Sequence, residues 1–191
     1  MTGRTHDLIA FTTLSAIIIY QPLHQISLGT ALIAFNANLI GGLTPDIDQP
    51  TAKLWGDIPA GSILGKIFSP LLGGHRTISH SFFGIALFGF LTHWILQLAS
   101  HTILVTMDTI WWAFMIGYVS HLIADTFTHE GVPWLFPLPV KFGIPPIKVL
   151  RPHTGGIIEK FVIFPGFIVI NGFLYYTNYG KFLQFFHHYI K

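Results

Sequence analysis

Hydrophobic positions in this chain fall into five long stretches, which short polar or proline-rich segments separate. The stretches are His6–Tyr20, Ile26–Leu43, Ser79–Ala99, Ile103–Phe127 and Ile157–Tyr176. Each approaches the roughly 20 mostly apolar residues that a helix needs to cross the hydrocarbon core of a bilayer. Pro165 lies inside the fifth stretch and is expected to kink it. The pattern predicts an all-α, polytopic transmembrane helical bundle of about five spans.

Three further segments are apolar but unsuited to span a membrane. Gly61–Leu72 is interrupted by glycine and proline, which predicts a short interfacial helix. Val132–Leu150 carries five prolines, and the missing backbone donors place it at headgroup depth rather than in the bilayer core. Lys181–Lys191 is expected to form an amphipathic interfacial helix. No small-residue cleavage site follows the first stretch, so we expect a retained helix rather than a signal peptide.

Composition supports the membrane interpretation. The chain is 51% hydrophobic and only 9% charged, whereas soluble domains carry about 25% charged residues. So few charges cannot cover a surface that faces water. A length of 191 residues is compatible with one domain, residues 1–191. The net charge of +2 gives no argument for a nucleic-acid partner, and the absence of cysteine excludes disulfides and thiolate metal sites.

Histidine is unusually frequent in this apolar chain. Its eleven copies outnumber the eight aspartates and glutamates. An imidazole inside a bilayer is costly unless it lines a polar cavity or coordinates a ligand. The histidines therefore indicate where a function would lie.

Alternation of five spans sorts the charged residues onto two faces. The N-terminus, the Thr44–Ile78 connection and the Thr128–Gly156 connection then share one face. This face carries most of the basic residues: Arg4, Lys53, Lys66, Arg76, Lys141, Lys148, Arg151 and Lys160. The tendency of basic residues to remain inside the cell predicts that this face is cytoplasmic in a multi-pass protein of the inner (plasma) membrane.

Eight potential metal ligands fall on the same face, although they come from five separate stretches. They are His6, Asp46, Asp48, His75, His80, His121, Asp125 and Glu159. Imidazole and carboxylate together suit zinc or a similar divalent ion. Because eight ligands exceed the four of one tetrahedral zinc, the sequence favours a site of two or more ions.

Two of the motifs have simple structural alternatives. His121 and Asp125 are four residues apart and share a face of a helix, but a helical histidine bonded to an aspartate also occurs inside transporters. Asp46 and Asp48 follow Pro45 in a turn that could merely cap a helix. In the functional interpretation, one of the two carboxylates binds metal and the other orients an imidazole or a water.

The segment GGHRTISHS places two imidazoles and a guanidinium just before the third stretch. Arg76 suits a bidentate contact to a phosphate oxygen, although it could equally contact lipid headgroups as ordinary interface decoration. Glu159 begins the fifth stretch, where a carboxylate is also favourable for the helix dipole alone. His129 and Glu130 are second-tier candidates, because they lie beyond the expected end of the fourth helix.

Several segments, in this order, resemble the YdjM-like family of LexA-regulated, membrane-bound metal-dependent hydrolases. They are TGRTHDLIAF, GGLTPDIDQP, GHRTISHSFFG, IGYVSHLIADTFTHEGVPWLFPLP and IIEKF. The resemblance implies a helical inner-membrane protein, distantly similar to zinc-dependent phospholipase C and P1-type nucleases. Carried over by position, it implies Asp48 at the site and the following metal ligands: His6, Asp46, His75, His80, His121, Asp125 and Glu159. Gln49 departs from the family, in which a histidine often follows the Asp-x-Asp turn; this copy would then bind one ion fewer or be inactive.

The expected function is hydrolysis of a phosphoester, such as a phospholipid, by metal-activated water, with two or three Zn²⁺ ions. Asp48 and Arg76 are the candidate catalytic residues. Asp48 would be an aspartate whose oxygens are not all bound to metal, so that it could act as general base. Arg76 would contact the phosphate. Two alternatives use the same cluster. One is a metal-ion or proton transporter, and the other is a membrane protein with a closed, structural metal site.

Overall fold

The computed structural model describes residues 1–20, 26–74, 76–184 and 187. Its long helices are α1 (Gly3–Tyr20), α2 (Leu28–Leu43), α5 (Phe82–Ala99), α6 (Met107–Thr126) and α7 (Phe164–Thr177). Its short helices are η1 (Thr44–Asp48), α3 (Lys53–Gly56), α4 (Gly61–Leu71), η2 (Lys148–Leu150), η3 (Glu159–Ile163) and α8 (Tyr179–Gln184). The described residues form no β-strand, and Val132 and Phe142 make an isolated bridge. The predicted all-α class is confirmed.

Each predicted hydrophobic stretch contains one long helix, and local chemistry sets where two of them begin. Ser27 and Ser81 lie immediately before α2 and α5, and their hydroxyls accept hydrogen bonds from the backbone N–H groups of Thr30 and Gly84. Such caps satisfy donors that a helix leaves open at its N-terminus. Ahead of α7, η3 is a π-helical turn that ends just before Pro165, where a backbone donor is missing.

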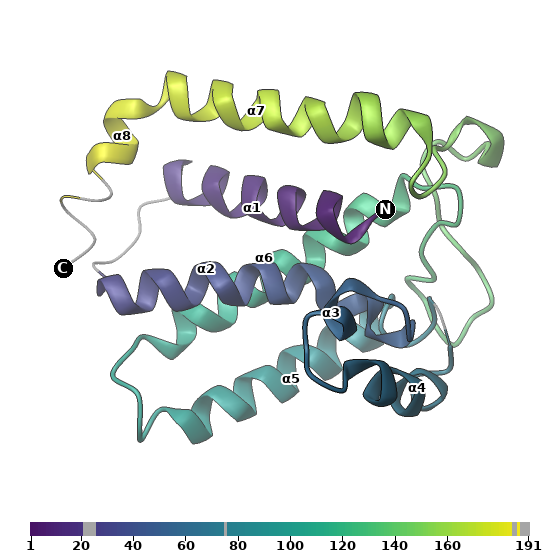
Figure 1. Ribbon diagram of the computed structural model, residues 1–191, viewed down its shortest axis with the longest axis horizontal. Helices are drawn as coiled ribbons and strands as arrows, with labels where there is room; N and C mark the ends of the chain where they lie inside the picture. Colours follow the sequence, from purple (N-terminus) through teal and green to yellow (C-terminus); the bar gives the residue numbers. More distant parts are fainter. Residues whose placement is uncertain (21–25, 75, 185–186, 188–191) are drawn as a thin grey trace.

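Helix α6 lies at the centre of the bundle between α2, α1 and α5, while α7 packs outside α1 (Figure 1). Helices α2 and α6 approach closely at glycines. A Cβ atom added to Gly41 would collide with the backbone carbonyl of Phe114, and one added to Gly117 would collide with that of Asn38. Small residues of this kind allow helix backbones to come into contact. The α2–α6 contact therefore depends on glycine.

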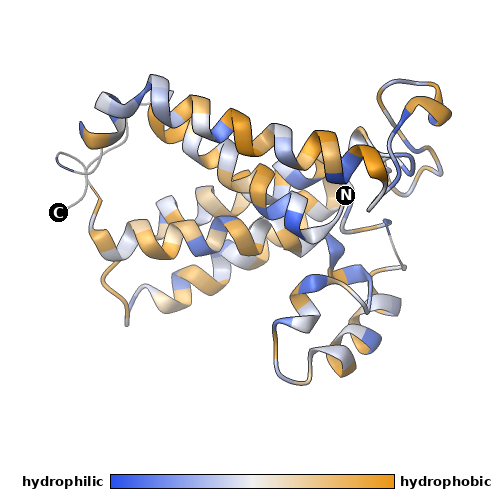
Figure 2. Cartoon of the chain, turned by 45° about the horizontal axis from the view of Figure 1, so that its top comes forward, coloured by the Kyte–Doolittle hydropathy of each residue, from blue (hydrophilic) through white to orange (hydrophobic). Residues whose placement is uncertain are grey.

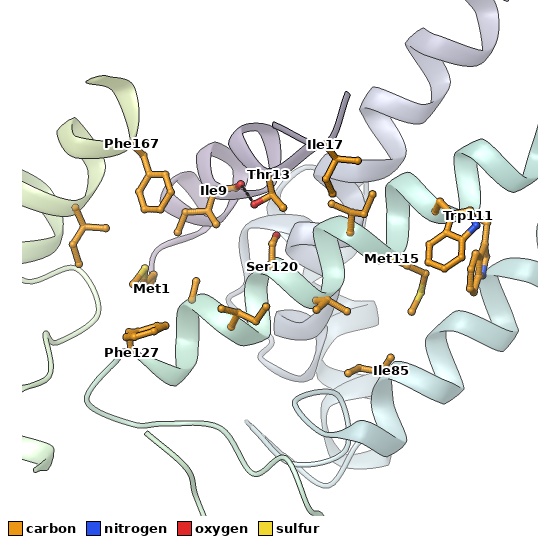
Figure 3. A pocket seen from close by; sticks show the side chains of 16 residues that line it. Met1, Ile9, Thr13, Ile17, Ile85, Trp111, Met115, Ser120, Phe127 and Phe167 are labelled. Carbon is orange, nitrogen blue, oxygen red and sulfur yellow. Dashed lines mark hydrogen bonds between the residues drawn. The ribbon is translucent and has the colours of Figure 1, made fainter. Parts of the chain in front are cut away.

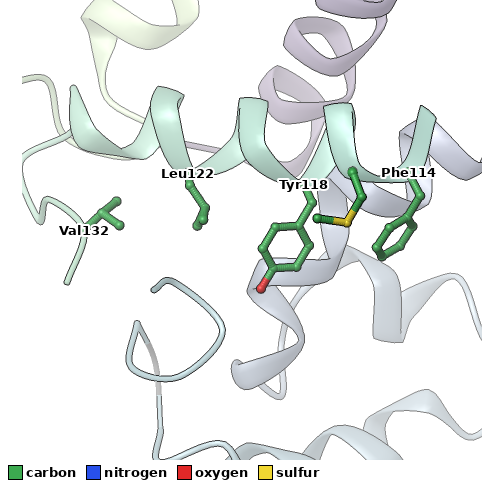
Figure 4. Close-up of a cluster of buried hydrophobic side chains, with 5 residues drawn as sticks. Phe114, Tyr118, Leu122 and Val132 are labelled. Atoms are coloured by element: carbon green, nitrogen blue, oxygen red, sulfur yellow. The ribbon is translucent and has the colours of Figure 1, made fainter. Parts of the chain in front are cut away.

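The α6 helix also supplies much of the hydrophobic core. Phe114, Tyr118 and Leu122 project from the same side of it, with Val132 beyond Leu122 (Figure 4), and all four are buried. The Tyr118 hydroxyl donates a hydrogen bond to the backbone carbonyl of Ser79, directly before His80. The core thus fixes the segment that leads into α5.

Two helices in the described part of the chain are long and apolar enough to cross a membrane: α5, and the continuous helix Glu159–Thr177 formed by η3 and α7. Only 11% and 6% of these two segments are buried inside the protein, and apolar residues colour much of the outside of the bundle (Figure 2). Two helices therefore meet this requirement, and the expectation of about five spans is not supported. Helix α2 is shorter, with 16 residues, while α1 and α6 bear polar residues such as His6 and Asp125.

The connections agree with their predicted character. Helix α4 occupies most of the predicted Gly61–Leu72 helix, and Val132–Leu150 is irregular apart from η2. Of the predicted C-terminal helix, α8 covers only the beginning, and most of the remainder lies outside the described residues. The N-terminus, α3, α4 and the 132–156 connection gather at one end of the bundle, and α8 lies at the other (Figure 1).

Candidate metal site

Four side chains meet where α2 and α6 end and α5 begins. They are Asp46, His80, His121 and Asp125, and one ligand atom from each lies within 4.8 Å of the others. Both histidines and Asp125 are fully buried, whereas the Asp46 side chain is 18% exposed. Asp46 is therefore the member of the group that solvent reaches.

The spacing of these atoms suits a small cation. Nε2 of His80 and Nε2 of His121 each lie 3.6 Å from Oδ1 of Asp46. The same nitrogens lie 3.8 and 3.7 Å from Oδ2 of Asp125. Ligands about 2.1 Å from a tetrahedral zinc are about 3.4 Å from one another, so four of the six ligand separations already approach this value.

The surroundings of His121 determine which of its two ring nitrogens carries the proton. Nδ1 lies 2.7 Å from the carbonyl oxygen of Gly42, which can only accept, so Nδ1 carries the proton. In a neutral imidazole, Nε2 then has a free lone pair. This buried nitrogen makes no hydrogen bond with the described residues, although two carboxylates face it. Its environment fits a metal ligand whose other nitrogen is fixed by a backbone carbonyl.

His80 is oriented by a carboxylate instead. Oδ2 of the buried Asp48 lies 3.2 Å from His80 Nδ1 and also accepts hydrogen bonds from the Ser79 hydroxyl, at 2.6 Å, and the Arg76 backbone N–H, at 2.8 Å. With Nδ1 directed at Asp48, Nε2 faces Asp46 and Asp125. A carboxylate behind a histidine is a frequent second layer around protein-bound metals.

Arg76 is buried between the group and the 132–156 connection. Its guanidinium pairs with Asp125 and donates to the Thr128 hydroxyl and the Gly131 carbonyl, at 3.0 and 3.1 Å. Its φ of 58° lies in the left-handed region, which is uncommon for a residue other than glycine. These contacts hold it in that conformation. Here Arg76 positions Asp125, and its contact to a substrate phosphate remains a prediction.

Charges within the group reinforce each other. Burial opposes ionisation of Asp46, but the surrounding imidazoles, with His80 as a hydrogen-bond donor, outweigh this and hold the pKa of the carboxyl below its ordinary value. Burial also acts against a charged His80, yet the carboxylates of Asp46 and Asp48 raise the pKa of its imidazole. The carboxylates of Asp46 and Asp125 thus favour a cation between them and the two imidazoles.

The remaining sequence candidates have other positions. His6 stacks on His121 with ring centroids 3.5 Å apart, and its Nε2 lies 3.2 Å from Oδ1 of Asp125. Asp125 therefore directs Oδ2 toward His80 and His121, and Oδ1 toward His6. Glu159 is not a member of the group: its Oε1 accepts from Thr2 and Thr5, and its Oε2 accepts from the Gly155 N–H at 2.7 Å.

Two further candidates, His129 and Glu130, are not brought to the group. His75 lies outside the described residues. His129 and Glu130 form a neighbouring contact, with Nδ1 of the histidine 3.6 Å from the glutamate oxygen, and the His129 ring stacks on His153. Gln49, which replaces the family's frequent histidine, donates a hydrogen bond to Thr51 on the exposed surface.

Some contributors had no recognisable signal in the sequence. The carbonyl of Gly42 assigns the protonation of His121, and the hydroxyls of Thr2 and Thr5 hold Glu159. Ser79 precedes His80 in the GGHRTISHS segment, but nothing in the sequence distinguishes it from other polar loop residues. Backbone carbonyls and hydroxyls acquire such roles only when distant segments meet.

Comparison with known proteins identifies relatives across most of the chain. The family model described as "YdjM inner membrane protein" matches residues 1–183. The protein YvsG of Bacillus subtilis (strain 168) is 28% identical over 163 residues, which cover 85% of this chain and 88% of YvsG. The inner membrane protein YdjM of Escherichia coli (strain K12) is 32% identical over 128 residues, or 66% of this chain and 59% of that protein. No solved structure matches the chain.

Proposed function

Because the chain belongs to the YdjM inner membrane protein family, we propose that it is a membrane-bound metal-dependent hydrolase that acts on a phosphoester, such as a phospholipid. The observation that carries the proposal is the group of Asp46, His80, His121 and Asp125, whose ligand atoms converge within 4.8 Å in a buried site. A nitrogen- and oxygen-only ligand set of this kind suits Zn²⁺. Hydrolase activity, zinc and the likeness to phospholipase C and P1-type nucleases belong to the proposal.

In this proposal, each residue has a defined task. His80, His121, Asp46 and Asp125 would hold the ion, which would supply Lewis acidity and, where a coordination position stays open to water, would lower the pKa of that water to about 7. Asp48 keeps Nε2 of His80 directed into the group, and the Gly42 carbonyl does the same for His121. The partly exposed Asp46 marks the side from which substrate and water enter. Arg76 pairs with Asp125, and in the proposal its guanidinium would also contact a phosphate oxygen of the substrate.

A second ion would use atoms that already lie beside the group. Asp125 directs Oδ1 toward Nε2 of His6, at 3.2 Å, while its Oδ2 faces His80 and His121. His6 and Asp125 would be the residues that hold this second ion. This arrangement supports the expectation of more than one ion.

The membrane arrangement is also part of the proposal. Helix α5 and the Glu159–Thr177 helix would face lipid, and α1, α2 and α6 would cross the membrane between them, with their polar residues directed inward. The end that carries the site also carries most of the basic residues, so we place it on the cytoplasmic face. A site at that depth suits a lipid headgroup.

Elemental analysis of the purified protein tests the metal first, with Asp46→Ala/His121→Ala as the matched variant. We expect at least one zinc per wild-type chain and almost none in the variant. Hydrolysis of a water-soluble phosphodiester and of phospholipid in mixed micelles then tests the reaction. Wild-type protein without metal would defeat the proposal. Metal without any hydrolysis would instead favour a structural site, and metal flux into liposomes would favour a transporter.

A further inference from the structure

A large apolar groove runs along α6, on a different side from its contact with α2. Its volume is about 800 Å³. Ile9 and Ile17 of α1, Ile85 of α5 and Phe167 of the α7 helix form its walls, and α6 forms its floor from Trp111 to Phe127 (Figure 3). Helices that belong to an inner membrane protein thus enclose a hydrocarbon-lined space.

Three of the polar side chains in this groove donate to backbone carbonyls of the surrounding helices. The Thr13 hydroxyl donates to the carbonyl of Ile9 at 2.9 Å, and the Ser120 hydroxyl donates to that of Gly117 at 2.8 Å. The Trp111 indole N–H donates to the carbonyl of Gly89 at 2.8 Å. Because these donors are satisfied, the groove favours an occupant without polar groups along its length.

The dimensions select the kind of occupant. Trp112 and Phe127 are 15 residues apart along α6, which corresponds to about 22 Å of helix. Hydrocarbon in one leaflet of a bilayer is about 15 Å deep, so an acyl chain fits within this length. Over about 22 Å, the volume of the groove gives a mean cross-section of about 36 Å². A narrow, continuous apolar groove of this length suits an extended hydrocarbon chain.

One end of the groove adjoins the candidate metal site. Ser120 and Ala124 line the groove in the same turns of α6 that carry His121 and Asp125 of the four-residue group on an adjoining face. Met1 joins the two places, since its side chain lines the groove and its backbone nitrogen contacts the Asp125 carboxylate. A lipid tail in the groove would therefore carry its headgroup to the group.

We propose that the groove binds an acyl chain of a membrane glycerophospholipid and thereby places the lipid phosphate at the four-residue group. This inference rests on the proposed function for its catalytic consequence, in which it defines the substrate class as an intact phospholipid. Binding of the chain itself depends only on the groove. The two statements can therefore fail separately.

Cross-linking in vesicles tests the binding. The wild-type protein is reconstituted in phosphatidylethanolamine and phosphatidylglycerol with a small fraction of phosphatidylglycerol that carries a photoactivatable acyl chain, and cross-linked peptides are mapped by mass spectrometry. Val119→Trp fills the groove from α6. Val169→Trp makes the same change on the exposed surface of α7, where Val169 is 69% exposed. Thermal unfolding and the size-exclusion profile confirm that both variants fold.

We expect wild-type cross-links concentrated on groove residues such as Met115 and Phe167. Val119→Trp should reduce them at least fivefold, and Val169→Trp should leave them unchanged. His121→Ala should retain them, because the groove does not need the metal; this result would uphold the inference even if no hydrolysis is found. Cross-links spread evenly over α5 and α7 and insensitive to Val119→Trp would overturn it, as would a second copy of the chain cross-linked in the groove.

Where hydrolysis is measurable, the same variants test the catalytic consequence. Val119→Trp should raise the KM for phospholipid at least fivefold and leave the hydrolysis of a water-soluble phosphodiester unchanged. An equal loss on both substrates would contradict the assignment of the groove to the lipid tail, because filling it would then have disturbed the reaction site itself.

Discussion

The most informative perturbation removes Asp48, which contacts His80 of the candidate site and also holds the backbone of Arg76. Oδ2 of Asp48 lies 3.2 Å from His80 Nδ1 and accepts hydrogen bonds from Ser79 and the Arg76 backbone. Asn in place of Asp48 can direct its single oxygen at the same donors but loses the negative charge. Ala removes both. The two variants therefore separate the electrostatic part of the orientation of His80 from the geometric part.

Loss of such an outer partner lowers metal affinity about 10- to 100-fold. We expect Asp48→Asn to lie near the lower limit, a loss of about 1.4 kcal/mol, and Asp48→Ala near the upper one, about 2.7 kcal/mol. The assay is a zinc titration of the detergent-solubilised protein against a chromophoric chelator. Thermal unfolding of the metal-free variants shows how much stability each change costs by itself.

Asp57→Asn is the matched control, because Asp57 is 55% exposed and pairs with Lys53 on the surface. Exposed pairs of this kind contribute about 0–1 kcal/mol, and the zinc affinity of this variant should equal that of the wild type. If Asp48→Ala binds zinc within twofold of the wild type, the reasoning that Asp48 orients a metal-binding imidazole is wrong.

Three other predictions follow from the same contacts. Gly117→Leu should destabilise the protein by about 3 kcal/mol, since its side chain would collide with the Asn38 carbonyl, whereas Gly166→Leu, with open space around it, should unfold at the wild-type temperature. Glu159→Gln should lower the unfolding temperature, because one of the groups that donate a hydrogen bond to Glu159 would face an amide N–H₂. The zinc affinity of this variant should stay within threefold of the wild type. A loss of zinc affinity comparable with that of His121→Ala would show that Glu159 binds metal. Free zinc at one hundred times its Kd should stabilise the wild type by about 2.7 kcal/mol over the chelated protein, and should not stabilise Asp46→Ala/His121→Ala.

The sequence determined the helices and the pool of candidate ligands. Hydropathy is a property of consecutive residues, so the five long helices could be located from it, and the irregular Val132–Leu150 connection followed from its prolines. The helical period placed His121 and Asp125 on one face. Alternation of the helices then collected eight candidates at one end, and the four residues of the observed group are all among them.

Only the tertiary structure decided how those candidates divide. Asp46, His80, His121 and Asp125 converge, Asp48 stands behind His80, and Glu159 is engaged by Thr2 and Thr5. The physical reason is the close approach of α2 and α6 at their glycines, which brings the Gly42 carbonyl to His121 and Asp46 to both imidazoles. Such an approach depends on how two distant helices fit together, and hydropathy and spacing along the chain contain no measure of that fit.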